Sequence, residues 1–590
     1  MIFNDYYKKE LISLRTKGLE FSKNNPGLSS YLSKEGQDPD VERLLEGFAF
    51  LSGSLNQLLD QELPEVAHTL VQILWPDYNR VIPSYSIIQY AINKESNETI
   101  FIPKNSEVMS KVKPNVKQCN FRTVYDTEIL PIDLQSVEYF SNNKKSSIEL
   151  DFKATGATTL LNIKIEKLRL FLNGSKYVVY DLYLYLLKYV ENISIMLKDI
   201  NGEILKNIII DKSSIKAVGL DDKDYMLPYS ESLFSGYILL QEYFCFRDKF
   251  LFIDLLNLSK MKMVEEDILD KSKSFTIKIG FSKTFTNQEI PTKDNFILNA
   301  TPIINIFNTD AVPIKKDFSN DEYLIEPIEL TKEQGEVFSV ENVRAWSDKT
   351  SSYQDMLPFE EFEHSAEGRE FYSIKTKTSN QGDRTNSYIR FSNVSRENVF
   401  SNISTTVSLK LLCTNRNIPT NLRIGDICIP KIGVNSVNTP FKNITVPTIS
   451  YPPPIAKDFL WKIISNMSLN YLSLADINTL RRVLAVYDFY GAYDLKQREI
   501  NARNLEGLVS IDYSKCEYID EGFPIKGHHI KIKLDKSKFS TLGEAYLFCT
   551  VINEFFSLYG SLNSFHRLSV EVLNEDTFEW PIKIGSKMVI

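Results

Sequence analysis

The chain has few of the residues and motifs on which metal and redox chemistry depends. Only 5 of its 590 residues are histidines, and its 6 cysteines lie far apart without a Cys-x-x-Cys pair. Zinc sites and disulfide frameworks need such residues in clusters, so neither is expected here. We predict buried, reduced thiols instead, at Cys119, Cys245, Cys413, Cys428, Cys516 and Cys549.

Motifs for phosphate and nucleophile chemistry are also missing. The sequence contains neither a Gly-x-x-x-x-Gly-Lys loop nor a Gly-x-Gly-x-x-Gly loop, and no Gly-x-Ser-x-Gly elbow. His528 and His529 are adjacent, but neighbours on a strand point to opposite faces and cannot chelate one ion. We therefore expect no cofactor, no metal and no catalytic residue of these kinds.

Charge and hydropathy argue against nucleic acid and membrane partners. The net charge is -8 with mixed signs, and the lysines between Lys111 and Lys117 are typical of a solvated turn. The apolar stretch Tyr177–Val190 contains Asp181 and Lys188, so no run approaches the roughly 20 residues of a membrane span. Met1–Tyr6 lacks the basic start and apolar core of a signal peptide. We expect a cytoplasmic protein without direct membrane insertion.

The composition that remains is that of a large soluble protein. Apolar residues make up 43% and charged residues 24%, with 36 Phe and 30 Tyr. At roughly 150 residues per domain, the length indicates about three or four domains. We predict an α+β multidomain fold, divided into an N-terminal helical region 1–86, a β-rich middle region 87–445, a proline-rich linker 446–456 and an α+β C-terminal domain 457–590.

The N-terminal region shows helical periodicity. A first helix carries Tyr7, Leu11, Leu14 and Phe21; Asp38 and Pro39 begin a second, and Pro64 a third. The second helix is apolar on more than one side, which predicts burial in a bundle with partners. Its candidate interface residues are Val41, Leu44, Leu45, Phe48, Phe50, Leu51, Leu55, Leu58 and Leu59.

Later segments alternate between strand and helix patterns. Period-two alternation predicts strands at Thr99–Ile102, Leu161–Ile165 and Phe275–Ile279, and one helix interrupts them near Asp181–Tyr189. Pro452–Pro454 are a candidate pivot. Beyond them we predict a helix at Phe459–Met467, capping boxes at Ser473/Asp476 and Thr541/Glu544, and a β-α-β unit around Ile530–Leu534, Phe548–Tyr559 and Leu568–Val572.

Paired acids are the remaining candidates for catalysis. Glu42 and Glu46 share a helix face, and Glu62 and Glu65 follow nearby. Two carboxylates at a suitable separation can hydrolyse glycosides. An acid in a first helical turn is also favoured by the helix dipole, and this structural interpretation is preferred.

Several distinctive stretches follow one another along almost the whole chain. The most specific is Asp38–Leu51, and the others are Tyr6–Leu11, Glu62–Glu65, Leu74–Tyr78, Cys119–Thr123, Gly236–Phe244, Pro302–Phe307, Cys413–Pro419, Ser468–Asn470, Phe555–Tyr559 and Asn563–Phe565. In this order they resemble the TssF family of type VI secretion proteins. The chain departs from the family at Gly53–Leu55, where a basic residue tends to precede the aliphatic one. It also departs at Asp77, where His is common.

The resemblance implies a structural role without catalysis. TssF-like proteins form the wedges of a baseplate and are similar to the wedge proteins of contractile phage tails. Two copies join one TssG, the unit binds TssK and TssE, and six wedges surround the VgrG hub. The wedges dock on the membrane complex and start the tube and sheath. The resemblance thus implies that Val41–Leu63 packs with TssG and a second copy, whose domain angles differ.

Two alternatives remain at this stage. The first is a wedge protein of another contractile tail machine, which gene neighbours would distinguish. The second is a β-rich carbohydrate-active enzyme that uses an acid pair, which requires two carboxylates facing each other across a deep pocket.

Overall fold

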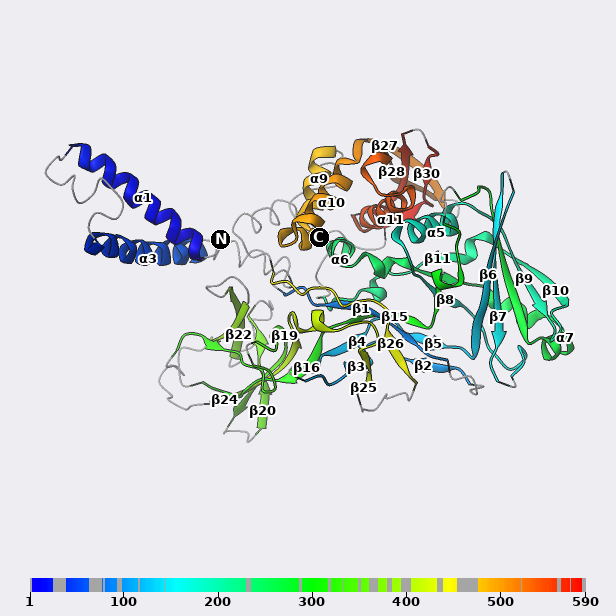
Figure 1. The fold of residues 1–590 in the computed structure, drawn as a ribbon, viewed down its shortest axis with the longest axis horizontal. Coiled ribbons are helices and arrows are strands. Elements are labelled where there is room, and N and C mark those ends of the chain that lie inside the picture. The colour runs from blue at the N-terminus through cyan, green and yellow to red at the C-terminus, as the bar shows by residue number, and fades with distance from the viewer. Residues whose placement is uncertain are drawn as a thin grey trace. The chain divides into compact units, whose positions relative to one another are not determined.

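The computed structural model describes residues 3–24, 39–62, 77, 80–92, 98–114, 117–142, 144–156, 158–229, 235–285, 289–316, 320–331, 333–347, 352–359, 370–378, 385–393, 405–431, 439–453, 476–520, 523–559, 564–573 and 575–585. Helices lie mainly towards the two ends of the sequence, with many strands between them (Figure 1). Contacts divide the chain into two compact units. The smaller comprises Met1–Val81, Asn308–Thr414 and Pro452–Ser468, and the larger comprises Ile82–Phe307, Asn415–Tyr451 and Leu469–Ile590. The sequence-based division at 86, 445 and 456 stays a prediction.

The first two helices form an antiparallel hairpin (Figure 1). α1 spans Phe3–Asn24 and α3 spans Pro39–Glu62, which confirms both predicted helices. The Arg15 guanidinium lies 2.8 Å from the Glu42 carboxylate, and the Ser52 hydroxyl donates to Glu10 over 3.1 Å. A later residue on α1 thus contacts an earlier residue on α3, so the two helices run in opposite directions. The predicted cap Asp38 and the third helix predicted from Pro64 lie outside the described residues.

A six-stranded sheet gathers distant parts of the larger unit in the order β25-β3-β4-β15-β1-β26. Its strands are β1 (Tyr85–Tyr90), β3 (Glu107–Ser110), β4 (Asn120–Thr123), β15 (Ala300–Ile304), β25 (Ile427–Pro430) and β26 (Phe441–Asn443). A separate pair is formed by β2 (Ile100–Ile102) and β5 (Thr127–Ile129). Ile88, Phe121, Ile303 and Ile427 are fully buried in a common core.

Two further sheets and three helices complete the middle of the larger unit. One sheet runs β10-β9-β13-β7-β6 and the other β11-β12-β8-β14. The strands are β6 (Ile132–Ser141), β7 (Ser146–Ala154), β8 (Leu168–Leu172), β9 (Val190–Lys198), β10 (Ile204–Ile210), β11 (Ile215–Ala217), β12 (Phe252–Leu255), β13 (Ser274–Phe281) and β14 (Phe296–Leu298). The helices are α5 (Lys176–Lys188), α6 (Ser235–Cys245) and α7 (Glu266–Lys271). β13 and α5 confirm the strand and helix predicted there.

The smaller unit contains two sheets. One runs β16-β24-β19-β20 with β17 paired to β24, and the other runs β18-β23-β22-β21. The strands are β16 (Phe307–Asp310), β17 (Ile314–Lys316), β18 (Tyr323–Leu324), β19 (Glu336–Ser347), β20 (Ser352–Asp355), β21 (Leu357–Pro358), β22 (Glu370–Thr378), β23 (Thr385–Asn393) and β24 (Thr405–Thr414). Val343, Phe371, Ile389 and Leu409 are fully buried.

The C-terminal part is α+β, as predicted. It contains α9 (Ile477–Val486), α10 (Leu495–Glu506), β27 (Leu508–Asp520), β28 (Phe523–Leu534), α11 (Leu542–Tyr559), β29 (Ser564–Val572), β30 (Phe578–Glu579) and β31 (Lys583–Ile584). β28 and β29 are parallel neighbours with α11 between them in the sequence. The predicted β-α-β unit is therefore confirmed.

The strand predicted at Leu161–Ile165 was wrong, because this segment is a turn followed by coil. Ile163 and Ile165 are buried while Lys164 is exposed, which produces strand-like alternation without strand pairing. The backbone groups find other partners. The Asn162 N–H donates to the Thr159 carbonyl over 3.1 Å, and the Leu161 carbonyl accepts from the Lys262 ammonium.

The capping boxes were only partly correct. Asp476 is itself the N-cap of α9 and accepts from the Thr479 N–H over 2.8 Å, so it is not the third residue of a box begun by Ser473. At α11, the Thr541 hydroxyl accepts from the Glu544 N–H over 3.1 Å, as predicted. The Glu544 carboxylate, however, accepts from the Ser540 N–H over 2.8 Å.

A buried histidine lies between the C-terminal sheet and α11. His566 on β29 is 2% exposed, and its Nε2 lies 3.1 Å from Asn553 Oδ1 on α11. Burial, assisted by the positive charge of Lys583, lowers the pKa of His566 to about 4. His528 is its neighbour on β28, and Lys583 is itself paired with Glu554.

This histidine predicts a loss of stability in mild acid. The unfolded imidazole takes up its proton near pH 6.5, whereas the folded one does so near pH 4, so the unfolded state binds more protons between these values. From pH 7 to pH 5 the wild type should lose roughly 2 kcal/mol more unfolding free energy than His566→Gln. Hydrogen exchange of the slowest α11 and β29 amides at both pH values, corrected for the intrinsic exchange rate at each pH, measures this difference. Identical pH dependence in the two proteins would contradict it.

Candidate partner-binding site

The α3 helix exposes large apolar side chains on one face. Leu44 is 74% exposed, Phe48 61% and Leu51 67%. Their spacing of four and three residues places them on one side of the helix. Phe50 is also 54% exposed. Soluble proteins rarely expose contiguous apolar patches of this kind unless a partner binds there.

The side of α3 that meets α1 has a different character. Glu42 pairs with Arg15, Ser52 donates to Glu10, and Ala49 is fully buried. Small and polar side chains thus form the contact between α1 and α3, whereas the large side chains of Leu44, Phe48 and Leu51 remain exposed. Burying a Leu or Phe side chain contributes roughly 1.5–3 kcal/mol, so the free energy available on the exposed face is considerable.

The structure separates the nine candidate interface residues into three groups. Leu44, Phe48, Phe50 and Leu51 are exposed, whereas Val41 and Leu45 are half-buried. Leu55, Leu58 and Leu59 belong to α3, but their side chains lie outside the described residues. Binding of a partner by this face stays a prediction. The geometry suits a helical partner that presents apolar residues at matching intervals.

The candidate acid pair does not form a catalytic arrangement in the described residues. Glu42 is paired with Arg15 across the hairpin, and Glu46, one turn further along α3, is exposed. Glu65 lies outside the described residues, as does the side chain of Glu62. Among the described residues, Glu42 therefore stabilises the hairpin, and Glu42 and Glu46 do not face each other across a pocket.

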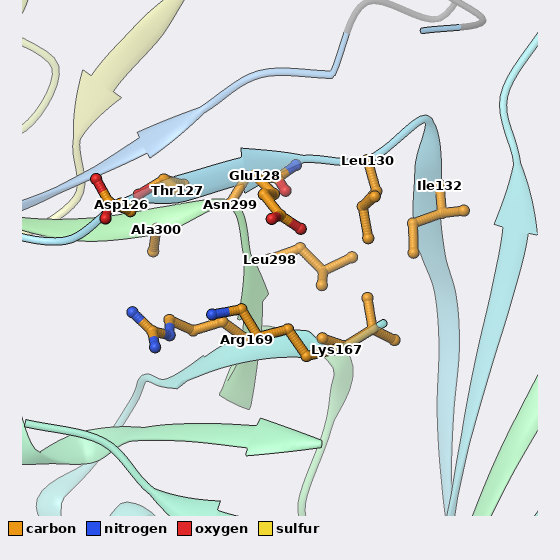
Figure 2. Close-up of a pocket in the computed structure, with 11 residues that line it drawn as sticks. Asp126, Thr127, Glu128, Leu130, Ile132, Lys167, Arg169, Leu298, Asn299 and Ala300 are labelled. Carbon is orange, nitrogen blue, oxygen red and sulfur yellow. The ribbon is translucent and has the colours of Figure 1, made fainter. Parts of the chain in front are cut away.

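A small pocket in the larger unit carries two other carboxylates (Figure 2). Asp126 and Glu128 come from one segment that includes β5, opposite Lys167 and Arg169 (Figure 2). Arg169 is already bound to Asp254 through two contacts of 2.7 and 2.8 Å. The cavity is about 30 Å³, enough for a few water molecules. Since both acids lie on the same side, they cannot flank a glycosidic bond, and the pocket does not favour a carbohydrate-active enzyme.

The described residues contain no recognisable metal or thiol centre. No group of three or more His, Cys, Asp and Glu side chains is placed to hold a metal ion in this part of the chain. His528 stacks on Tyr513, whereas His529 contacts the Ser569 hydroxyl at 2.9 Å, so the two rings have different neighbours. Cys119, Cys245, Cys413 and Cys549 are buried free thiols, and Cys428 and Cys516 are half-buried free thiols. Among the helices described, none is long and apolar enough to cross a membrane.

A fully buried ion pair, which the sequence did not predict, links Glu242 on α6 to Lys249 in the segment that follows this helix. Glu242 and Lys249 have no exposed side-chain area, and their charged groups are in direct contact. The Glu242 carboxylate also accepts from the backbone N–H groups of Met226 (2.6 Å) and Leu227 (2.9 Å). A charged residue inside the apolar stretch Gly236–Phe244 was the available signal, since such residues are almost never fully buried unless paired.

A second buried cluster joins the segment after α6 to the C-terminal part. Arg247 contacts Glu544 at 2.6 Å and Asn501 at 2.5 Å, and Asn504 donates to Glu544 over 3.1 Å. Burial acts to raise the pKa of Glu544, but Ser540 and Arg247 outweigh it and hold the pKa below its usual value. These contacts stabilise the packing of α6, α10 and α11 and offer no open site.

Comparisons with known proteins give a consistent result. Residues 2–587 match the sequence family described as Type VI secretion system, TssF. The type VI secretion system component TssF1 of Pseudomonas aeruginosa is 25% identical over 642 aligned positions, which cover 99% of this chain and 98% of that protein.

Two solved structures are similar to the chain as well. One chain of the TssK-TssF-TssG baseplate subcomplex, determined by cryo-electron microscopy, matches with a TM-score of 0.75 and 25% identity, covering 92% of this chain and 99% of that one. A chain of the baseplate complex from the type VI secretion system matches with a TM-score of 0.67 and 22% identity over the full length of both chains. These matches confirm the multidomain α+β fold.

Proposed function

Because the chain belongs to the TssF family of the type VI secretion system, we propose that it is a structural subunit of the secretion baseplate. Its partners there are TssG and TssK, the proteins named with TssF in the matching subcomplex. The role is architectural and without catalysis, which agrees with the small cavity and the engaged carboxylates of the described residues. The site of action is the cytoplasmic side of the membrane complex.

The finer proposal concerns the composition of the wedge. Two copies of this chain join one TssG, and the unit also binds TssE and contacts the VgrG hub. Wedges of this kind nucleate the contractile tail, and so act on the sheath and the membrane complex indirectly. The support for this arrangement is the family resemblance along the chain together with an apolar helix face that a bundle would cover.

The observation that carries the proposal is the exposed face of α3. Leu44, Phe48 and Leu51 form an apolar stripe on a helix whose other side already packs on α1. A helix that joins a bundle with TssG and a second copy needs such a stripe. We propose that this face is the binding surface.

The experiment is co-expression with a TssG-type subunit, followed by a mass measurement on the purified complex. The wild type should give a mass of two copies plus one TssG. The triple variant Leu44→Glu, Phe48→Glu, Leu51→Glu should weaken the complex by more than about 100-fold, because charges would have to be buried at the centre of the interface.

A matched control introduces the same chemistry elsewhere. Ile209 is 75% exposed and Met263 83% exposed, and neither lies on α3. Ile209→Glu with Met263→Glu should leave the complex unchanged. A wild-type chain that stays a clean monomer beside TssG would refute the baseplate proposal, whereas an intact complex with the triple variant would refute only the assignment to α3.

A further inference from the structure

Three cationic side chains gather on one side of the sheet β18-β23-β22-β21 in the smaller unit. Lys375 and Lys377 are two residues apart on β22, so their side chains point to the same side of the strand. Arg390 on β23 pairs with Ser373, which precedes Lys375 by two residues and therefore points to that side as well. We call Lys375, Lys377 and Arg390 the basic face.

The opposite side of these strands belongs to the core of the unit. Ile389 precedes Arg390 on β23, pairs with Ile374 on β22 and is fully buried. β23 also contacts β19 of the other sheet. The basic face is thus directed away from this core, and the side chains of Lys375, Lys377 and Arg390 are 40%, 44% and 50% exposed.

One carboxylate is shared by all three cations. Glu322 directly precedes β18 and lies 2.5 Å from Lys377 and 3.3 Å from Arg390. Its distance to the Lys375 ammonium is 3.9 Å. Burial acts to raise the pKa of Glu322, but the hydrogen bond from Lys377 and the three positive charges outweigh it and lower the pKa. The carboxylate is therefore ionised at neutral pH.

Three positive charges against one negative charge leave the basic face with an excess of two. Asp321 is exposed beside Glu322, and in the part of the chain that the structure describes it forms no ion pair with the three cations. Like charges at neighbouring positions of a sheet are unfavourable. Among the described contacts, Arg390 uses one of its five N–H groups, so its planar fork is able to bind a further carboxylate.

We propose that the basic face binds an extended acidic segment of a partner protein, with carboxylates at every second residue. Arg390, Lys375 and Lys377 stand at three successive levels along the sheet, each two residues from the next. Alternate residues of an extended segment are roughly 6.7 Å apart, which is the same spacing. Nucleic acid is disfavoured, because it requires a longer basic track than three cations in a chain of net charge -8. The inference does not depend on the baseplate proposal.

The probe is a dye-labelled peptide with three glutamates at alternate positions, and fluorescence anisotropy measures its binding to the full chain at low ionic strength. One control peptide has the same composition with the three glutamates adjacent, and another has glutamine in their place. The alternating peptide should bind about fivefold more tightly than the adjacent one, because the adjacent arrangement loses at least one ion pair. The glutamine peptide should not bind.

Two variants should shift the affinity in opposite directions. Lys375→Gln with Arg390→Gln should weaken binding of the alternating peptide by roughly tenfold or more, since two ion pairs are lost. Glu322→Gln should tighten it by about threefold, because the carboxylate no longer competes for the cations. The control is Arg344→Gln on β19, which removes a 48% exposed cation paired with Asp355 at 2.8 Å and should change nothing. Unchanged or weaker binding by Glu322→Gln, or no loss in the double variant, would overturn the proposal.

Two other occupants would give different results. Glu360, Glu361, Glu363 and Glu367 precede β22 in the sequence and lie outside the described residues. If the chain binds the peptide only after these four are replaced by glutamine, a stretch of the chain itself occupies the basic face, which would refute a partner segment. Tighter binding of a single-stranded oligonucleotide of equal charge would refute it in favour of nucleic acid.

Discussion

Replacing Lys249 by methionine is expected to destabilise the larger unit by roughly 3–5 kcal/mol, because removing one partner leaves the other as an uncompensated buried charge. Neither Lys249 nor Glu242 has exposed side-chain area. The Glu242 carboxylate would keep the N–H groups of Met226 and Leu227, but these carry no full positive charge. Methionine preserves much of the packing against the rings of Tyr225 and Phe250, so most of the loss is electrostatic.

Hydrogen exchange at the α6 amides is the appropriate measurement. The full chain contains two units, so a single denaturation curve does not report one transition. In Lys249→Met these amides should exchange much faster, while amides of β19 and β24 in the smaller unit should be unaffected. The control is Lys145→Met, which breaks an ion pair of 2.6 Å with Glu191 whose side chains are 57% and 44% exposed. An exposed pair is worth about 1 kcal/mol or less.

A double variant separates charge from packing. Glu242→Gln with Lys249→Met removes both charges. The stability that this double variant loses should be smaller than the sum of the losses in the two single variants. Additive costs would show that the two groups do not interact, and a loss in Lys249→Met as small as in Lys145→Met would show the same. Either result would also remove the physical reason for a charged residue within the apolar stretch Gly236–Phe244.

The sequence predicted the elements whose pattern is local. α3 follows from Pro39 and the apolar spacing after it, α5 from Leu182, Tyr185 and Leu186, and β13 from the alternation Phe275–Ile279. The same reasoning failed at Ile163 and Ile165. There the alternation of buried and exposed side chains is set by packing of a loop, and a single sequence does not distinguish that from a strand.

Features that depend on distant residues could not be predicted in this way. Asn305 and Asn415 are 110 residues apart and have no pattern in common, yet a buried hydrogen bond of 2.9 Å links their side chains. Arg247 and Glu544 meet across 297 residues. Such pairs are fixed by the tertiary arrangement, whereas periodicity reports only which face of one element is apolar.

The candidate partner site was predictable to a similar extent. The sequence placed Leu44, Phe48 and Leu51 among nine candidate interface residues, and the structure shows that these three share an exposed face. The sequence could not show that Ala49 and Ser52 face α1, because that depends on how the hairpin closes. It therefore grouped inward and outward apolar residues of α3 together.

Gly543 should be intolerant even of alanine. It lies at the start of α11, directly against the backbone of α5, and an added Cβ would lie 2.7 Å from the Asp181 nitrogen and closer still to the Tyr180 carbonyl. Backbone atoms cannot yield as a flexible side chain would, so α11 must move away from α5. Overpacking of this kind costs about 3 kcal/mol, more than the gain in helix propensity from alanine.

The displacement should also weaken neighbouring contacts, which makes it measurable. Glu544 follows Gly543 directly and contacts Arg247 at 2.6 Å, so the buried cluster should loosen as the helices separate. We expect faster hydrogen exchange in both α5 and α11 of Gly543→Ala than in the same helices of the wild type. The control is Gly47→Ala on α3, where no atom lies within 4 Å of the added Cβ, and alanine should stabilise that helix by up to about 1 kcal/mol. If Gly543→Ala proved as stable as the wild type, α5 and α11 would have to be able to separate without cost.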